Sequence, residues 1–147
     1  MTVLDHPRVL LVDDNETILE RAAAALSSAC VIVGAVKDGV AALESTETLQ
    51  PDVVVLDISM PGMTGFEVAR FLRRRGSTVP IVFLTVHDED GFVEAAQAAG
   101  GIGFVIKGML VTDLAVAISE ACAGRQYISR PAMTCAREAS AERPPLA

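Results

Sequence analysis

The stretch that decides the fold runs from Asp52 to Gly65 and reads Asp-Val-Val-Val-Leu-Asp-Ile-Ser-Met-Pro-Gly-Met-Thr-Gly. Residues 53–56 form an unbroken apolar run of strand-favouring side chains, which is typical of a strand covered on both faces in a parallel sheet. The run stops at Asp57, and a proline and two glycines then turn the chain before a helical pattern begins. Ligands bind at the carboxyl ends of the strands in open α/β sheets, so Asp57 stands where chemistry is expected.

The same succession of apolar run and helical pattern repeats on both sides of this stretch. The strands are expected at 8–12, 30–36, 53–56, 79–84 and 104–106, and the helices at 16–28, 39–48, 64–75, an Ala-rich segment ending near 99, and 111–123. Five strands that alternate with five helices imply right-handed crossovers and a parallel sheet covered by helices on both sides.

Composition restricts the classes of protein to which the chain can belong. Its 147 residues suit one domain with a true core, and 51% of them are apolar, with one Tyr and no Trp. Residues 1–124 carry 17 acidic and 8 basic side chains. This acidic body is not expected to bind nucleic acid directly, because phosphates need Lys and Arg, whereas clustered acids suit cations.

The cysteines and the hydropathy pattern bear on where the protein resides. Cys30, Cys122 and Cys135 lack C-x-x-C spacing and are expected to be buried thiols. No early segment has the apolar core of a signal peptide, and no apolar run approaches the ~20 residues that span a bilayer. We therefore expect a reduced, cytoplasmic protein that does not enter a membrane.

The periodic pattern of apolar residues ends after Gly124. Residues 1–124 are expected to form the domain, and residues 125–147 a linker stub or disordered tail, in which Tyr127-Ile128-Ser129 could pack briefly. This tail carries 4 basic and 2 acidic side chains, in contrast to the acidic body.

Reactive side chains lie at the ends of four expected strands. Asp13 and Asp14 follow the first strand, Asp57 the third, Thr85 the fourth and Lys107 the fifth. A parallel sheet would gather all five at one edge, where the three acids would bind a hard divalent cation through oxygen, with Mg²⁺ the best fit. Asp57 could then attack phosphorus to form an aspartyl-phosphate, while Lys107 and the Thr85 hydroxyl bind phosphoryl oxygens.

Taken singly, these residues have simpler explanations. Asp13 or Asp14 alone would be a helix N-cap, Thr85 alone an ordinary strand residue, and Lys107 alone a solvated amine. The arginines 73–75 are likewise expected to complement the dipole at the end of a helix rather than to bind phosphate. The functional interpretation rests on the order and shared strand-end placement of the five residues together.

In this order the motifs resemble the receiver domain of two-component response regulators, of the CheY-like kind, over residues 7–124. The motifs are Leu-Val-Asp13-Asp14, Val-Leu-Asp57-Ile-Ser-Met-Pro-Gly-Met, Phe-Leu-Thr85 and Gly-Phe-Val-Ile-Lys107. The resemblance implies a flavodoxin-like (βα)5 sandwich with sheet order 2-1-3-4-5. It also implies that Asp57 accepts phosphate from a histidine kinase or phosphotransfer protein, with Mg²⁺ bound by Asp14, Asp57 and the Ser59 backbone carbonyl and, mainly through water, by Asp13.

The family also implies a switch. Thr85 would move toward the phosphoryl group and Phe104 would turn inward, which would reshape the face formed by the fourth helix, fifth strand and fifth helix. Plain core packing is an equally open explanation for Phe104. Ser59 and His87 each lie two residues past a site residue and are expected to influence the lifetime of the phosphate, although His87 alone is weak evidence of a functional role.

Two positions depart from the usual family pattern. The residue after Thr85 is usually small and is here Val86, which could narrow access to the site. The lysine is often followed by proline and is here followed by Gly108. This Lys-Gly form and the Ala-Gly-Arg-Gln-Tyr-Ile-Ser segment at 123–129 resemble the NarL/FixJ subfamily, whose receivers precede a DNA-binding helix-turn-helix.

The resemblance leaves the output and two other functions open. The chain stops before the ~60–70 residues that a helix-turn-helix module needs, so it is expected to be a stand-alone receiver or part of a longer transcription regulator. A phosphorylation-dependent homodimer is a further hypothesis. The alternatives are a degenerate receiver acting as an interaction domain without phosphorylation, and an Mg²⁺-dependent phosphatase resembling haloacid dehalogenases, although residue 59 is Ser where those enzymes have a second Asp. As a receiver it would not be a metabolic enzyme and would catalyse only its own phosphorylation and dephosphorylation.

Overall fold

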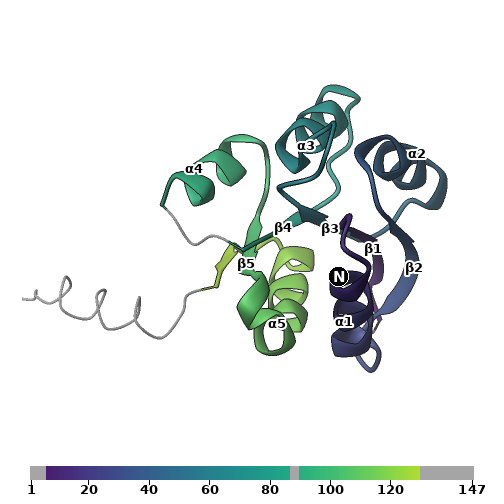
Figure 1. Cartoon of the computed structure of the whole chain (residues 1–147), viewed down its shortest axis with the longest axis vertical. Coiled ribbons are helices and arrows are strands. Elements are labelled where there is room, and N and C mark those ends of the chain that lie inside the picture. The colour runs from purple at the N-terminus through teal and green to yellow at the C-terminus, as the bar shows by residue number, and fades with distance from the viewer. Residues whose placement is uncertain (1–5, 87–89, 130–147) are drawn as a thin grey trace, which may run out of the picture.

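The computed structural model describes residues 6–86 and 90–129, with the backbone alone at 90–92. Strands and helices alternate along this part of the chain (Figure 1). The strands are β1 (Arg8–Val12), β2 (Val31–Val36), β3 (Val53–Asp57), β4 (Ile81–Thr85), β5 (Gly103–Ile106) and β6 (Tyr127–Ile128). The helices are α1 (Glu16–Leu26), α2 (Gly39–Leu49), α3 (Gly65–Arg74), α4 (Asp90–Ala98) and α5 (Leu110–Cys122), with a 3₁₀ turn η1 (Lys107–Met109) before α5.

The strands form one parallel sheet between two layers of helices. The spatial order is β2-β1-β3-β4-β5-β6, and every neighbouring pair is parallel. Helices α1 and α5 cover one face, and α2, α3 and α4 cover the other (Figure 1). The predicted flavodoxin-like architecture and the order 2-1-3-4-5 are confirmed, and a sixth short strand is added.

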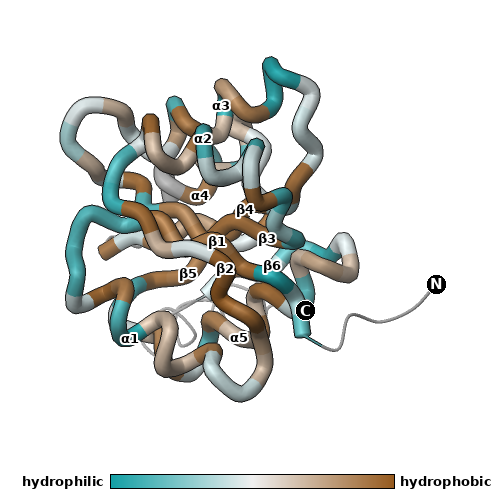
Figure 2. The backbone as a smooth tube through the Cα atoms, turned by 90° about the vertical axis from the view of Figure 1, so that its right-hand side faces the viewer, coloured by the Kyte–Doolittle hydropathy of each residue, from teal (hydrophilic) through white to brown (hydrophobic). Residues whose placement is uncertain are grey.

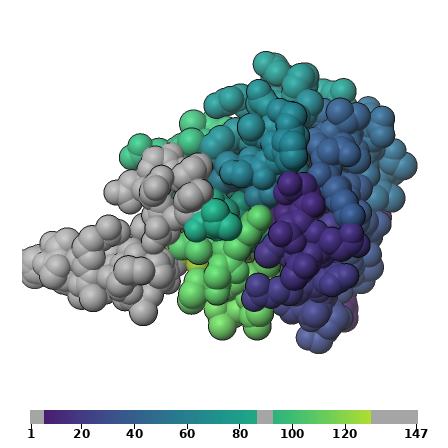
Figure 3. Space-filling view, in the orientation of Figure 1, coloured from purple at the N-terminus to yellow at the C-terminus, as the bar shows by residue number. Residues whose placement is uncertain are grey.

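Alternation along the central strands divides the core in two. Val9 and Leu11 of β1 face α1 and α5, whereas Leu10 and Val12 face the other helix layer. All five residues of β3 are buried, as the apolar run predicted. The apolar colour follows the strands through the centre of the molecule (Figure 2). The space-filling view shows the purple surface of α1 beside the green surface of α5 (Figure 3).

Polar side chains start three of the helices. The Asn15 side chain accepts a hydrogen bond from the Ile18 backbone at 3.2 Å, and Asp38 caps α2. Thr64 and Glu67 form a reciprocal capping box at the start of α3. Because Asn15 caps α1, the N-cap explanation for Asp13 and Asp14 is wrong.

The sequence interpretation differs from the structure mainly after α5. Residues 127–128 form strand β6, and the Ser129 side chain is only 2% exposed, so ordered structure extends past the boundary expected at 124. The rest of the expected tail, 130–147, lies outside the described residues, as do His87 and Cys135. The other element ends lie within about two residues of their expected positions.

The thiols and the membrane prediction can be compared with the described residues. Cys30 is buried, as predicted, and burial raises its pKa. Cys122 is half-buried, and burial, followed by the nearby Asp52 and Cys30, raises its pKa, so neither thiol is activated. Within residues 6–86 and 90–129, every helix is too short or too polar to cross a bilayer.

Candidate functional site

The strand-end cluster, comprising Asp13, Asp14, Asp57, Thr85 and Lys107, lies at the carboxyl edge of the sheet. Val12 pairs with Leu56, so the next residues, Asp13 and Asp57, follow neighbouring strands. Thr85 pairs with Ile106 in the same way, directly before Lys107. The structure thus places all five predicted residues at one edge, as the parallel topology required.

An ion triad forms the centre of the cluster. The Lys107 ammonium lies 2.8 Å from Asp13 Oδ2 and 3.2 Å from Asp57 Oδ1. The two carboxylate side chains are 1% and 2% exposed and the lysine side chain is 13% exposed. Lys107 therefore bridges two buried acids that would otherwise repel each other, and is not the solvated amine of the simpler explanation.

The pKa of Asp57 is raised from 3.8 to about 6. Burial is the main cause, because it disfavours the charged form, and the nearby Asp13 carboxylate adds to it. Lys107 and the Ser59 backbone N–H oppose the rise by stabilising the carboxylate. Asp57 is consequently ionised near neutral pH, but its charge is destabilised in this site.

Lys107 responds to the same surroundings in the opposite sense. Burial lowers the pKa of its ammonium, but the hydrogen bond that the ammonium donates to Asp13 and the charges of Asp57 and Asp13 more than compensate, so the pKa is raised overall. The lysine therefore keeps its positive charge at neutral pH.

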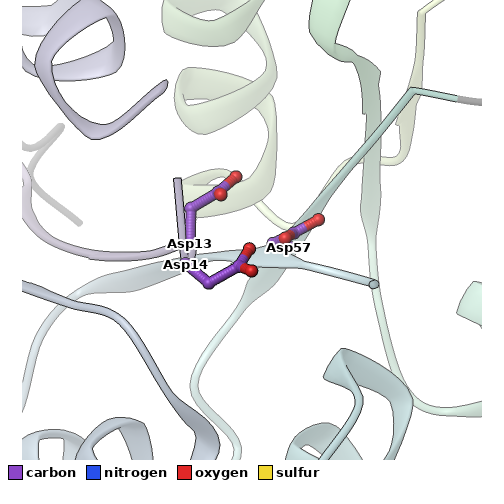
Figure 4. Close-up of side chains that lie close together, drawn as sticks. All are labelled: Asp13, Asp14 and Asp57. Carbon is purple, nitrogen blue, oxygen red and sulfur yellow. The ribbon is translucent and has the colours of Figure 1, made fainter. Parts of the chain in front are cut away.

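The three acids form a group whose composition suits a divalent cation. One carboxylate oxygen from each of Asp13, Asp14 and Asp57 can be chosen so that all three lie within 4.8 Å of one another, and the three side chains lie close together in Figure 4. Asp57 Oδ2 is buried and has no hydrogen-bond partner among the described residues. Three carboxylates against one ammonium leave an excess of negative charge, and an all-oxygen donor set fits Mg²⁺. The group could therefore bind Mg²⁺.

Backbone geometry holds Asp57 in place. The Ser59 N–H donates to Asp57 Oδ1 at 3.3 Å, which puts the backbone of residue 59 beside the carboxylate. Gly65 N–H donates to the Ile58 carbonyl at 2.8 Å, and a Cβ at residue 65 would lie 2.2 Å from the Asp57 carbonyl oxygen. Only glycine allows α3 to begin so close to the end of β3. From the sequence, Gly65 is expected only to help turn the chain, and this contact with the end of β3 could not be read from the local pattern.

A second contact that sequence reasoning missed involves Asn15. Its backbone N–H donates to Asp13 Oδ1 at 2.8 Å while its side chain caps α1. One residue thus fixes both the start of the helix and the orientation of an acid in the cluster. An Asn directly after the acidic pair and before a helical pattern was the available signal.

The proposed switch residues are both buried. Thr85 is 2% exposed at the end of β4, and Phe104 is 3% exposed on β5 among the core residues beneath α4. Phe104 therefore already lies inward, as core packing predicts and as the inward position of a switch would also require. Val86, the residue after Thr85, is 64% exposed and lies next to the cluster in sequence.

The chain resembles known proteins over most of its described length. Residues 9–119 match the family model of the response regulator receiver domain. Response regulator GacA of Pseudomonas aeruginosa is 34% identical over 124 residues, which cover 83% of this chain and 58% of GacA. The nitrate/nitrite response regulator NarL of Escherichia coli is 33% identical over 123 residues, which cover 82% of this chain and 57% of NarL.

A solved structure shows the same arrangement. The signal receiver domain of the response regulator NarL from Mycobacterium tuberculosis superposes with a TM-score of 0.78 at 34% identity, covering 83% of this chain and 100% of that domain. The match to these curated relatives spans little more than half of their length. The presence of NarL proteins among the relatives agrees with the expected subfamily character. From its sequence, fold and strand-end acids, the chain belongs to the response regulator receiver domain family.

Proposed function

We propose that this chain is a phosphorylation switch in which Asp57 accepts a phosphoryl group from a sensor histidine kinase or a phosphotransfer protein. The observation that carries the proposal is the buried Asp57 carboxylate, held between Asp13 and Lys107 with one oxygen unpartnered among the described residues. Such a charge is costly unless a cation and a reacting group complete its surroundings.

The proposed reaction is a direct phosphoryl transfer. A carboxylate oxygen of Asp57 forms a bond to phosphorus as the phosphorus–nitrogen bond of phosphohistidine breaks, and the imidazole keeps the bonding electrons and takes up a proton. Lys107 would hold a phosphoryl oxygen as a point charge, and Thr85 would donate a hydrogen bond to another. The later hydrolysis of the aspartyl-phosphate would be influenced by the residues at positions 59 and 87.

Mg²⁺ would be held by the side chains of Asp14 and Asp57 and the Ser59 carbonyl, with Asp13 mainly acting through water. When bound, it would neutralise charge on the phosphoryl oxygens. The carboxylate contacts support this assignment, because the Lys107 ammonium alone does not balance the three acids. Asp13 would also hold Lys107 in position through its 2.8 Å contact.

The output would pass through the α4–β5–α5 face. Movement of Thr85 and the inward position of Phe104 would bias this face toward a partner or a DNA-binding module beyond the matched segment, in agreement with the length of the NarL and GacA relatives. The exposed Val111 and Val116 of α5 support a phosphorylation-dependent homodimer. The acidic body itself is not proposed to contact nucleic acid, and the cytoplasm is the proposed location.

Two alternatives differ in what they predict at Asp57. A degenerate receiver would bind its partner without phosphate, which the complete strand-end cluster disfavours. A phosphatase would use a second acid two residues after the nucleophile, and that position is Ser59. Sustained release of phosphate from p-nitrophenyl phosphate would favour the phosphatase over the receiver.

Calorimetry with beryllofluoride, a mimic of the phosphoryl group, tests the proposal. The wild-type chain should bind beryllofluoride at about one equivalent in the presence of Mg²⁺ and lose this binding in EDTA. Asp57→Asn should bind none. Beryllofluoride binding that persists in Asp57→Asn, or that is absent from folded wild-type protein in Mg²⁺, would contradict the proposed function.

A further inference from the structure

Residues 127–129, here called the latch, return from α5 to the free edge of β5. Gly103 pairs with Tyr127 and Phe104 with Ile128 in parallel register. The Tyr127 N–H donates to the Ile102 carbonyl at 3.1 Å, and the Ser129 N–H donates to the Phe104 carbonyl at 2.7 Å. The latch thus supplies hydrogen-bond donors to backbone carbonyls at the edge of β5, including that of Phe104, the residue of the proposed switch.

The side chains of the latch fill both faces at this edge. Ile128 packs against the core beneath α4, in the cluster that contains Phe104, whereas Tyr127 packs against the core beneath α1 and α5. The space left between α4, β5 and the latch is a cavity of about 10 Å³, which holds one water at most. The burial of Phe104 therefore depends partly on the latch being docked.

A part-buried hydrogen bond anchors the end of the latch. Ser129 Oγ donates to Asp113 Oδ2 at 2.6 Å across 16 residues of sequence, and Ser129 is 2% exposed. The distance is typical of a charge-assisted bond to a carboxylate. Asp113 lies in the first turn of α5 and also interacts with Tyr127. Burial raises the pKa of Tyr127, and the charge of Asp113 and a hydrogen bond to Asp113 raise this pKa further.

We infer that docking of the latch and phosphorylation of Asp57 favour each other through the inward position of Phe104. This inference rests on the proposed function, in which the phosphorylated state has Phe104 turned inward. The docked latch hydrogen-bonds the Phe104 backbone and packs Ile128, the register partner of Phe104, against the same core cluster, so it stabilises that position. Two events that stabilise one state are reciprocally linked, and each must strengthen the other by the same factor.

The test combines amide hydrogen exchange with beryllofluoride titration in Mg²⁺, using the full chain. Ser129→Ala removes the anchor. Ser119→Ala makes the same chemical change at an exposed position of α5 and serves as the matched control. Saturating beryllofluoride should slow exchange of the Tyr127 and Ser129 amides about fivefold in the wild-type chain, and Ser129→Ala should weaken beryllofluoride binding by about the same factor. Ser119→Ala should match the wild type in both measurements.

Faster latch exchange in Ser129→Ala with unchanged beryllofluoride affinity would overturn the inference and leave the proposed function intact. Latch exchange that is insensitive to beryllofluoride in the wild-type chain would do the same. Absence of beryllofluoride binding by folded wild-type protein would instead overturn the proposed function, and the inference with it. If Ser129→Ala melts below the assay temperature, Asp113→Asn keeps a carbonyl acceptor, weakens the anchor, and should lower the affinity in the same direction.

Discussion

At the scale of the residue, Asp57 is an acid whose charge the fold disfavours. Its pKa of about 6 lies above the value of 3.8 expected when the chain is unfolded, so the folded state holds the proton more tightly than the unfolded state. Protonated Asp57 therefore favours folding below pH 4, and this contribution is lost as the pH rises through about 6. Because the negative charge of Asp57 is unfavourable in the metal-free site, a bound cation would stabilise it.

Asp57→Asn should accordingly stabilise the metal-free protein at pH 8 but not at pH 4. The gain at pH 8 should be on the order of 3 kcal/mol, since the pKa rises from 3.8 to about 6 and one pKa unit corresponds to about 1.4 kcal/mol. Urea unfolding of both proteins in EDTA at the two pH values would measure it. A gain that is equal at both pH values would show that the charge of Asp57 is not its source.

Mg²⁺ affinity should depend on the same titration. Because the cation needs the ionised carboxylate, binding should be about tenfold weaker at pH 5 than at pH 8 for a group with a pKa of about 6. Calorimetric titration with MgCl₂ at the two pH values would measure this ratio. Equal affinities would mean that Asp57 is not a ligand or does not titrate in this range.

The sequence predicted the members of the cluster but not their energetics. Strand ends in a parallel sheet converge, so Asp13, Asp57 and Lys107 could be placed together from the alternation of elements alone. The raised pKa of Asp57 arises from burial and from Asp13, which depend on packing in three dimensions. For the same reason Phe104 could not be assigned a rotamer from its position in a strand.

At the scale of the element, α3 is fixed to the site by Gly65. A methyl group there would lie 2.2 Å from the Asp57 carbonyl, so Gly65→Ala should lower the free energy of unfolding by about 2 kcal/mol or more and weaken Mg²⁺ binding by displacing Asp57. Gly108→Ala is the matched control, because a Cβ there meets nothing within 4 Å. Thermal unfolding and Mg²⁺ titration would measure the stability and the Mg²⁺ affinity of both variants. Equal losses in Gly65→Ala and Gly108→Ala would refute a special role for Gly65.

Arg73 stands in the last turn of α3, where the arginines were expected to complement the helix dipole, and it also ties the end of α3 to two neighbouring segments. Its guanidinium donates to the carbonyls of Ser77, Val79 and Gly100 at 3.2, 2.8 and 2.6 Å. Burial lowers its pKa, although not enough to remove the charge. Gly100 is 27 residues away, so no local pattern could have indicated this role.

Arg73→Ala should therefore destabilise the fold by about 2–3 kcal/mol, because three part-buried carbonyls lose a charged donor. Arg75→Ala, which removes an exposed ion pair with Glu47 at 3.8 Å, should change stability by less than about 0.5 kcal/mol. Chemical unfolding of the two variants would compare them. A loss of similar size in both would mean that the charge of the run matters and the carbonyl contacts do not.

Strand β6 shows the limit of pattern reasoning at this scale. Strands β3 and β4 can be recognised from their apolar runs, because both faces of each strand are buried. Residues 127–128 are too few to show a period, and they become a strand because β5 offers them a free edge. The expectation of brief packing at this segment was the most that the sequence supported.

At the scale of the whole molecule, the central sheet connects the strand-end cluster to the α4–β5–α5 face, to which a partner could bind. Under the proposed function, beryllofluoride with Mg²⁺ should double the hydrodynamic mass. Val111→Asp on α5 should prevent this, whereas Val40→Asp on α2, where the valine is 58% exposed compared with 63% for Val111, should not. Sedimentation velocity would measure both, and an unchanged wild-type mass would rule out the homodimer while leaving the phosphoacceptor proposal standing.

Intact mass spectrometry can show whether Asp57 is a phosphoacceptor that depends on Mg²⁺. The wild-type chain and Asp57→Asn would be incubated with acetyl phosphate and Mg²⁺, with EDTA as a parallel condition. We expect one phosphoryl adduct on the wild-type chain, lost with EDTA and absent from Asp57→Asn. No adduct on folded wild-type protein that binds Mg²⁺, or an adduct that persists in Asp57→Asn, would contradict it.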